Sequence, residues 1–217
     1  MRVKRQASKV FDPSCRACPR LSGHLESVRA EHPDYHAAPV PPFGPARAKL
    51  LVVGLAPGRH GANATGRVFT GDHAGVLLYE TLHRHGFANQ ANSIHERDGL
   101  RLNQCRITNA VKCLPPANKP TAEEVMNCNR FLAAELDSLP TPGVILALGA
   151  IAHKAVLRAR QLKQGAYPFG HGSEYQLEDG RWLIDSYHCS RYNTQTRRLT
   201  SEMFDCVIAR ARKLIDL

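Results

Sequence analysis

Four short apolar runs recur along the chain, and none of them alternates cleanly between apolar and polar positions. Val, Ile and Leu dominate these runs, which is typical of strands buried on both faces of a sheet. The runs are Leu50–Val53, Arg106–Val111, Val144–Leu148 and Trp182–Ser186. The pattern therefore predicts a central sheet of four buried strands.

Helical patterns lie between the apolar runs. Apolar residues recur there at spacings of three and four positions, and Thr121-Ala-Glu-Glu124 has the sequence of a capping box, which opens a helix. Strands that alternate with helices favour a parallel sheet covered on both faces. We therefore predict an α/β fold, a three-layer sandwich with a central four-stranded parallel sheet. The predicted helices are His73–His85, Thr121 to about Leu136, Gly149 to about Gln161 and Thr196–Leu214.

The length of the chain favours a single domain over residues 1–217, with an irregular N-terminal arm over residues 1–25. No apolar run approaches ~18 residues, so no membrane span is expected. The basic N-terminus lacks the apolar core of ~7–15 residues that a secretory signal needs. The expected location is therefore the cytoplasm, and the expected oligomeric state is a monomer.

The chain is strongly basic. Its 29 Lys and Arg residues exceed its 19 Asp and Glu residues, which gives a formal net charge of +10. Such an excess of positive charge favours a polyanionic partner such as DNA or RNA. Charge alone does not exclude the alternative that the chain is a basic protein that binds no nucleic acid.

The segment Val53–Gly75 holds six of the 16 glycines and directly follows the first apolar run. A strand that leads through glycines into a helix brings backbone amides close to a ligand. The spacing from Gly61 to Gly66 is that of a phosphate loop. The next residues are Arg67 and Val68, where that loop needs Lys and then Ser or Thr. A nucleotide triphosphatase is therefore not expected.

Two pairs of cysteines suggest a metal site. Cys15 and Cys18 are separated by two residues in the N-terminal arm. Cys113 follows a predicted strand, and Cys128 lies on the helix predicted after it. Without a secretory signal a disulfide framework is not expected. Four thiolates hold zinc or an iron–sulfur cluster. The alternative that the spacing leaves open is a set of four unrelated core thiols.

Polar and aromatic residues stand where the predicted strands end or soon after. The amide of Asn109 suits the edge of a base, although it could instead cap a turn. His188 could donate to a developing anion, or be structural. Asp72 could be the N-cap of the next helix or could orient a water. Phe69 is an aromatic plate that could stack on a base, or pack in the core.

Taken together, these motifs resemble the uracil-DNA glycosylase superfamily, and most closely its family 5, the type-b enzymes. The resemblance covers most of the chain and several motifs in the same order. The motifs are Cys15–Leu21, Gly54–Gly58, Thr65–Asp72, Asn109–Pro120, His188–Asn193 and Arg198–Thr200.

The resemblance implies a central four-stranded parallel sheet between helices. It implies that the chain removes uracil or another deaminated base from DNA. It also implies a [4Fe–4S] cluster rather than zinc, so that residues 1–25 form a cluster-binding arm. The cluster would be held by Cys15, Cys18, Cys113 and Cys128.

The resemblance also assigns roles to individual residues. His188 corresponds to the histidine of the second active-site motif, while Asp72 and Asn63 occupy the loop where family 5 keeps polar residues near the catalytic water. Phe69 corresponds to the stacking plate and Asn109 to the residue that recognises the base edge. The residues expected to contact the substrate are Gly54, Ala56, Phe69, Asn109, Arg191 and Tyr192.

The chain departs from the family pattern at two places. Family 4 enzymes carry Glu directly after the first glycine of motif one, where this chain has Leu55. Family 5 usually has H-P-S-P-x-N in the second motif, whereas this chain has His188-Cys-Ser-Arg-Tyr-Asn193. Without the two prolines we expect a more flexible loop, in which Arg191 or Tyr192 fills the space that a flipped base leaves.

These departures affect the expected substrate. Without an acid at Leu55 we expect a wider range of bases, with hypoxanthine and xanthine as candidates beside uracil. Two alternative functions stay open at this stage. One is a nucleic-acid-binding module with a metal-stapled arm and no catalysis, and the other is an enzyme acting on free nucleosides, against which the net charge of +10 argues.

Overall fold

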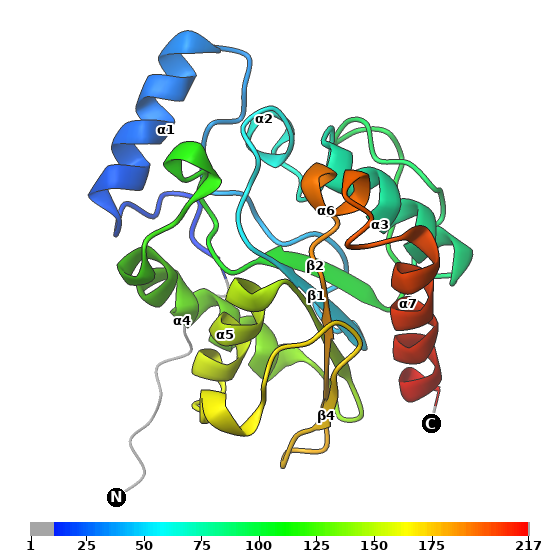
Figure 1. Cartoon of the computed structure of the whole chain (residues 1–217). Coiled ribbons are helices and arrows are strands. Elements are labelled where there is room, and N and C mark those ends of the chain that lie inside the picture. Colours follow the sequence, from blue (N-terminus) through cyan, green and yellow to red (C-terminus); the bar gives the residue numbers. More distant parts are fainter. Residues whose placement is uncertain (1–10, 217) are drawn as a thin grey trace, which may run out of the picture.

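A five-stranded sheet forms the centre of the computed structural model, which describes residues 11–216 (Figure 1). The strands stand in the order β2-β1-β3-β5-β4. Four of them are parallel, and β4 pairs with β5 in the antiparallel direction. The strands are β1 (Leu50–Gly54), β2 (Cys105–Asn109), β3 (Val144–Leu148), β4 (Glu174–Gln176) and β5 (Trp182–Ser186).

The predicted α/β architecture and its four parallel strands are confirmed, but the predicted number of strands is wrong. The fifth strand, β4, is short and lies at the edge of the sheet, where Tyr175 pairs with Leu183 of β5. Its residues are partly or fully exposed. An edge strand of this kind needs no continuous apolar run, so the hydrophobic pattern did not indicate it.

Helices cover both faces of the sheet because successive residues of each strand point to opposite sides. Leu50 and Val52 of β1 belong to the cluster that α3 and α7 cover, whereas Leu51 and Val53 belong to the cluster that α4 and α5 cover. This alternation of two apolar sets explains the unbroken apolar runs. The long helices are α1 (Pro19–Glu31), α3 (His73–Arg84), α4 (Ala122–Ser138), α5 (Ala150–Ala159) and α7 (Ser201–Ile215).

The predicted start of α4 is confirmed in detail. The hydroxyl of Thr121 accepts a hydrogen bond from the Glu124 N–H at 3.2 Å, and the Glu124 carboxylate accepts one from the Thr121 N–H at 2.7 Å. Both bonds satisfy N–H groups that a helix start leaves without partners. The capping box therefore fixes this helix start locally.

The helix predicted over Thr196–Leu214 is confirmed from Ser201 onward, but its predicted start is wrong. The short helix α6 (Arg191–Gln195) comes first, and α7 begins only at Ser201. Between them Arg197 has a φ of 57°, which a continuous helix does not allow. The hydroxyl of Thr200 then accepts a hydrogen bond from the Met203 N–H and caps α7.

The N-terminal arm is less irregular than predicted. Residues 1–10 lie outside the described residues, but residues 19–31 form α1. Its apolar side buries Leu21, Leu25 and Val28. The Arg20 guanidinium donates to both carboxylate oxygens of Glu124, at 2.8 and 2.7 Å. Packing and this ion pair therefore attach the segment from Pro19 onward to α4.

The carboxyl ends of the parallel strands meet at one edge of the sheet, where open α/β folds bind ligands. The loops that leave β1, β2 and β5 gather there. Two short helical turns belong to these loops, α2 (Ala62–Thr65) and a 3₁₀ turn (Pro116–Asn118). Over residues 11–216, no helix is long and apolar enough to cross a membrane.

Candidate active site

A cavity of about 340 Å³ lies where these loops meet. Binding sites for small ligands have volumes of about this size. Its wall is built from segments that are far apart in the chain. The lining residues are Leu55, Ala56, Gly58, Ala62, Phe69, Asp72, Ala74, Asn109, Asn118, His188 and Ser190.

Asn109 is the last residue of β2 and is only 3% exposed. Its Oδ1 is buried and has no hydrogen-bond partner among the described residues. A Cβ on Gly54 would stand 2.5 Å from this oxygen, so the glycine at the end of β1 is what gives the amide its room. The sheet register, which sets Gly54 beside Asn109, brings the two residues together.

Phe69 forms a second wall of the cavity. Its backbone has a φ of 53°, a left-handed conformation that is uncommon for a residue with a bulky side chain. The ring lies 2.7 Å from the position of a Cβ on Gly54 and is stacked with the His188 ring at a centroid distance of 5.8 Å. Phe69 therefore belongs to the core and to the cavity at once.

His188 follows β5 and lines the cavity, as expected for a residue at a strand's carboxyl end. Burial lowers the pKa of His188 to about 4. Loss of hydration disfavours the charged form of the imidazole, and among residues 11–216 no acidic group offsets that loss. The imidazole is therefore neutral at pH 7 and carries one N–H that it can donate.

One of the two functions that its sequence position suggests for Asp72, the helix N-cap, is confirmed, and its role toward a water stays a prediction. Its Oδ1 accepts a hydrogen bond from the Gly75 N–H at 2.8 Å and caps α3, and the same carboxylate lines the cavity. A Cβ on Gly61 would stand 2.6 Å from Oδ2, so this glycine makes room for the carboxylate. Burial raises the pKa of Asp72, although the N–H groups of Gly75 and Ala74 oppose the shift.

Among the other predicted site residues, Gly54, Asn63, Arg191 and Tyr192 do not line the cavity. Ala56 lines the cavity, and Leu55 does so as well. Asn63 is fully buried and does not line it; its Nδ2 donates a long bond of 3.5 Å to the Arg59 carbonyl. Its catalytic role stays a prediction.

Arg191 and Tyr192 lie beside the cavity rather than in it. They are the first residues of α6, directly after the cavity-lining Ser190, and both are exposed. The Ser190 hydroxyl accepts a hydrogen bond from the Asn193 N–H at 3.4 Å and caps α6. The segment expected to be a loop without its prolines thus starts a helix.

Two polar residues of the wall were not singled out by the sequence. Asn118 lies in the 3₁₀ turn with a φ of 56°, and Ser190 precedes α6. Asn is among the few residues that tolerate this conformation, and it follows two prolines here. That turn pattern was the signal available for Asn118.

The four predicted metal ligands gather on one side of the molecule, between α1 and α4. Cys15, Cys18, Cys113 and Cys128 line one small cavity. Burial raises the pKa of Cys113 to about 12, and the other three thiols add to the shift because they lie near it. Within residues 11–216, no group of three or more His, Cys, Asp or Glu side chains is arranged to hold a metal ion.

Donor groups point at three of these sulfur atoms. The backbone N–H of Lys112 donates to Cys128 Sγ at 3.3 Å. The Asn127 amide donates to Cys18 Sγ and the Arg130 guanidinium to Cys15 Sγ, each at 3.7 Å. Such donors stabilise negative charge on sulfur.

Comparison with known proteins identifies the family. A sequence model described as the uracil DNA glycosylase superfamily matches residues 41–212. The type-5 uracil-DNA glycosylase of Thermus thermophilus is 48% identical over 94% of this chain and 95% of its own length. The type-5 enzyme of Pyrobaculum aerophilum is 42% identical over 91% of this chain and 88% of its own length. A type-4 enzyme, from Archaeoglobus fulgidus, is 36% identical over 69% of each chain. This chain therefore belongs to the uracil-DNA glycosylase superfamily, and it is more similar to the type-5 enzymes named here than to the type-4 enzyme.

Proposed function

We propose that this protein is a monofunctional DNA glycosylase, which hydrolyses the N-glycosidic bond of uracil in DNA and leaves an abasic site. One observation carries the proposal. The unpaired amide oxygen of Asn109 lines a cavity that also presents a stacking ring, Phe69, and two ionisable groups, Asp72 and His188. Those groups match what removal of a base requires, and the type-5 relatives carry the same activity in their names.

Base recognition is assigned to Asn109 and Phe69. Uracil presents an imide N–H next to a carbonyl oxygen, and an Asn side chain offers the complementary acceptor and donor. A buried acceptor without a partner costs about 1–3 kcal/mol, and a bound uracil N–H would remove that cost. Stacking on an aromatic ring contributes about 1–3 kcal/mol per base. The cavity therefore favours a base that has left the DNA stack.

Departure of the base is assigned to His188. Cleavage of the glycosidic bond leaves negative charge on the base oxygens, and the neutral imidazole can donate its N–H to one of them. Loss of one donor of this kind costs ~10²–10³ in rate. Because the pKa of His188 is low, the imidazole stays in this form at neutral pH.

Water activation is assigned to Asp72. A raised pKa makes its carboxylate a stronger base than an exposed aspartate, and the same negative charge stabilises the sugar cation that forms. Leu55 supplies only apolar surface at its place in the wall. The reaction therefore depends on leaving-group stabilisation together with this one carboxylate.

Contact with the duplex is assigned to α6. A target base must leave the stack, at a cost of a few kcal/mol. Tyr192 is 70% exposed and Arg191 precedes it on the same helix, next to the mouth of the cavity. We propose that one of these side chains fills the vacated space, while the net positive charge holds the phosphates.

We further propose that hypoxanthine and xanthine are substrates beside uracil, because no acid stands at Leu55 to restrict the chemistry. A panel of oligonucleotides that each contain one uracil, hypoxanthine or xanthine tests this proposal. Release of uracil alone would contradict it. We also propose that the protein acts as a monomer, since all the groups named above come from one chain. We propose the cytoplasm as its location.

A [4Fe–4S] cluster is proposed for the four cysteines. The chemistry of the donor set supports this proposal, because four thiols line one cavity and donors from Lys112, Asn127 and Arg130 point at three of the sulfur atoms. The cluster would be structural, since hydrolysis transfers no electron; it would hold the segment around Cys15 and Cys18 against α4. Zinc is the alternative metal, and metal analysis separates the two.

The decisive experiment is measurement of base release from a duplex with a single uracil. Free uracil and an alkali-sensitive abasic site are expected. A protein that only binds nucleic acid would shift the duplex in a gel without forming an abasic site. An enzyme of free nucleosides would cleave deoxyuridine, and an excess of duplex would not inhibit it.

A further inference from the structure

The buried guanidinium of Arg67 has an acceptor for every one of its N–H groups. The side chain is 5% exposed. Nε donates to Thr70 Oγ1 at 2.8 Å, and the two terminal nitrogens donate to both carboxylate oxygens of Asp98 at 2.9 and 2.6 Å. They also donate to the Glu96 carbonyl at 3.3 Å and to Ser93 Oγ at 2.8 Å. Arg67 thus joins the glycine loop to a second loop.

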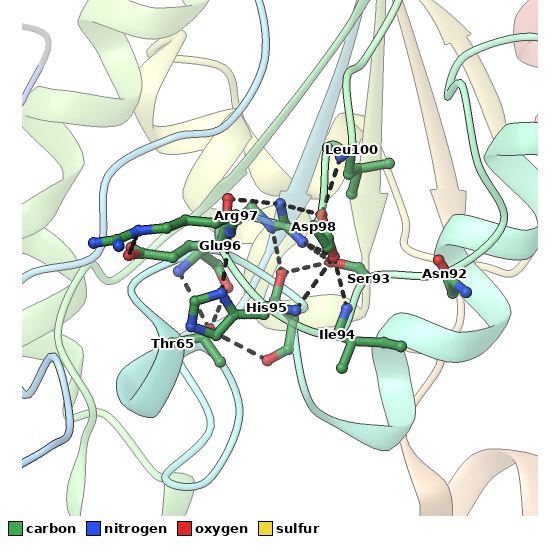
Figure 2. A network of polar contacts seen from close by, with 12 residues as sticks. Thr65, Asn92, Ser93, Ile94, His95, Glu96, Arg97, Asp98 and Leu100 are labelled. Carbon is green, nitrogen blue, oxygen red and sulfur yellow. Dashed lines mark hydrogen bonds and ion pairs between the residues drawn. The ribbon is translucent and has the colours of Figure 1, made fainter.

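Asp98 orders that second loop, which we define as residues 93–100. Figure 2 shows contacts from Asp98 to Ile94, His95 and Leu100, whose backbone N–H groups donate to its carboxylate at 2.9, 3.2 and 3.0 Å. Burial alone would raise the pKa of Asp98, but the bonds from Arg67 and these N–H groups hold it well below its usual range. The carboxylate is therefore charged at neutral pH.

The two loops meet directly beside Phe69. The Gly71 N–H donates to the Ser93 carbonyl at 3.2 Å, and the hydroxyls of Thr70 and Ser93 are 2.6 Å apart. On the other side, the Tyr79 hydroxyl donates to the Val68 carbonyl at 2.7 Å. The residues on both sides of Phe69 are thus held by hydrogen bonds.

Phe69 needs such support because its φ is 53°. A residue with a large side chain keeps a left-handed backbone only when its surroundings impose it. Asp72, three residues later, has a separate support, because its carboxylate caps α3 through the Gly75 N–H.

We infer that Arg67, held by Asp98 and the 93–100 loop, is a positioning residue that sets the Phe69 ring in the base pocket. The inference rests on the proposed function, since it concerns the pocket for the flipped base. Arg67 itself does not line the cavity and acts through Phe69.

The geometry requires arginine rather than positive charge alone. A lysine ammonium has three donors and no planar fork, so it cannot serve Thr70, Ser93 and both oxygens of Asp98 together. Arg67→Lys therefore keeps the charge and loosens the loop. A displacement of the order of 1 Å near a reacting group can cost about 10²-fold in rate.

A double-mutant cycle tests the inference. Uracil release is measured under single turnover for the wild type, Arg67→Lys, Phe69→Ala and the double variant. In the wild-type background, Arg67→Lys is expected to lower the rate of uracil release by at least about tenfold. In the Phe69→Ala background the same substitution is expected to lower the rate by less than about twofold, because Arg67 affects the rate through Phe69. The dissociation constant for abasic-site DNA is expected to stay within about twofold.

Equal losses in both backgrounds, or no loss in the wild-type background, would overturn the inference. Arg210→Lys is the matched control, because Arg210 makes a similar two-bond pair with Glu174, neither of which lines the cavity. If Arg67→Lys does not fold, Ser93→Ala replaces it in the cycle, with the same criteria. A wild type that releases no uracil would instead refute the proposed function.

Discussion

The rings of Phe69 and His188 are stacked, with centroids 5.8 Å apart and planes inclined by 29°. Phe69 belongs to the loop after β1 and His188 follows β5, so the two residues are far apart in the chain. They meet because β1 and β5 both lie next to β3, with their carboxyl ends at the same edge of the sheet. The ring that we propose to stack on a base thus lies beside the imidazole that we propose to donate to it.

Replacement of His188 by Ala is expected to slow uracil release by at least about tenfold, because the departing base loses its donor. The rate is measured with a single-uracil duplex under single turnover. His83→Ala is the matched control, since His83 is an exposed histidine on α3 and is expected to leave the rate unchanged. An unchanged rate in His188→Ala would refute the assigned role.

Replacement of Gly54 by Ala is expected to lower activity by at least about tenfold, since the added Cβ would stand 2.5 Å from Asn109 Oδ1 and 2.7 Å from the Phe69 ring. Gly23→Ala provides the contrast, because a Cβ there meets nothing within 4 Å. Gly23 lies inside α1, so this change is expected to stabilise the fold by about 0.5–1 kcal/mol. Thermal unfolding and uracil release, measured on both variants, check the two expectations; wild-type activity in Gly54→Ala would contradict the first.

The rate of uracil release is expected to show no inflection near pH 6.5. The pKa of His188 is lowered to about 4, so the imidazole stays neutral until the pH approaches that value. Burial raises the pKa of Asp72, so its carboxylate is protonated, and the rate falls, at a higher pH than for an exposed aspartate. The pH profile of the single-turnover rate checks this expectation. An inflection near pH 6.5 that disappears in His188→Gln would contradict the assignment.

The contribution of His188 to the free energy of unfolding is expected to depend on pH. Between its ordinary pKa of 6.5 and about 4, the unfolded chain binds a proton that the folded protein does not. The His188 contribution to the free energy of unfolding therefore falls as the pH is lowered through this window. The Asp72 contribution changes in the opposite direction, because the folded pKa of Asp72 is raised. The free energy of unfolding is therefore measured with urea at pH 7 and pH 5 for the wild type and for His188→Gln. The difference between the two proteins isolates the contribution of the histidine.

Purified protein is expected to be brown, with iron and sulfide near four of each per chain, as a [4Fe–4S] cluster requires. Cys113→Ser is expected to remove the colour and to lower the melting temperature, because the segment around Cys15 and Cys18 loses its attachment. Cys206→Ser is the control, since Cys206 is exposed and does not line the thiol cavity. One zinc per chain in a colourless protein would refute the cluster assignment.

The sequence by itself determined the elements whose causes are local. Apolar runs mark β1, β2, β3 and β5 because strands buried on both faces are mostly apolar. The start of α4 follows from the pairing of Thr121 with Glu124, three residues apart. The motifs also identify Phe69, Asp72, Asn109 and His188, and the structure places all of them in one cavity.

Only the tertiary structure decided the features that join distant segments. The edge strand β4 has no apolar run of its own, and the break between α6 and α7 depends on the left-handed backbone at Arg197. The support of Phe69 by Arg67 and Asp98 joins residues 31 positions apart, and no local pattern indicates such a pair. Hydrophobic periodicity and helix capping depend on residues only a few positions apart. A cavity wall depends instead on strand order and on side chains that meet only after the chain has folded.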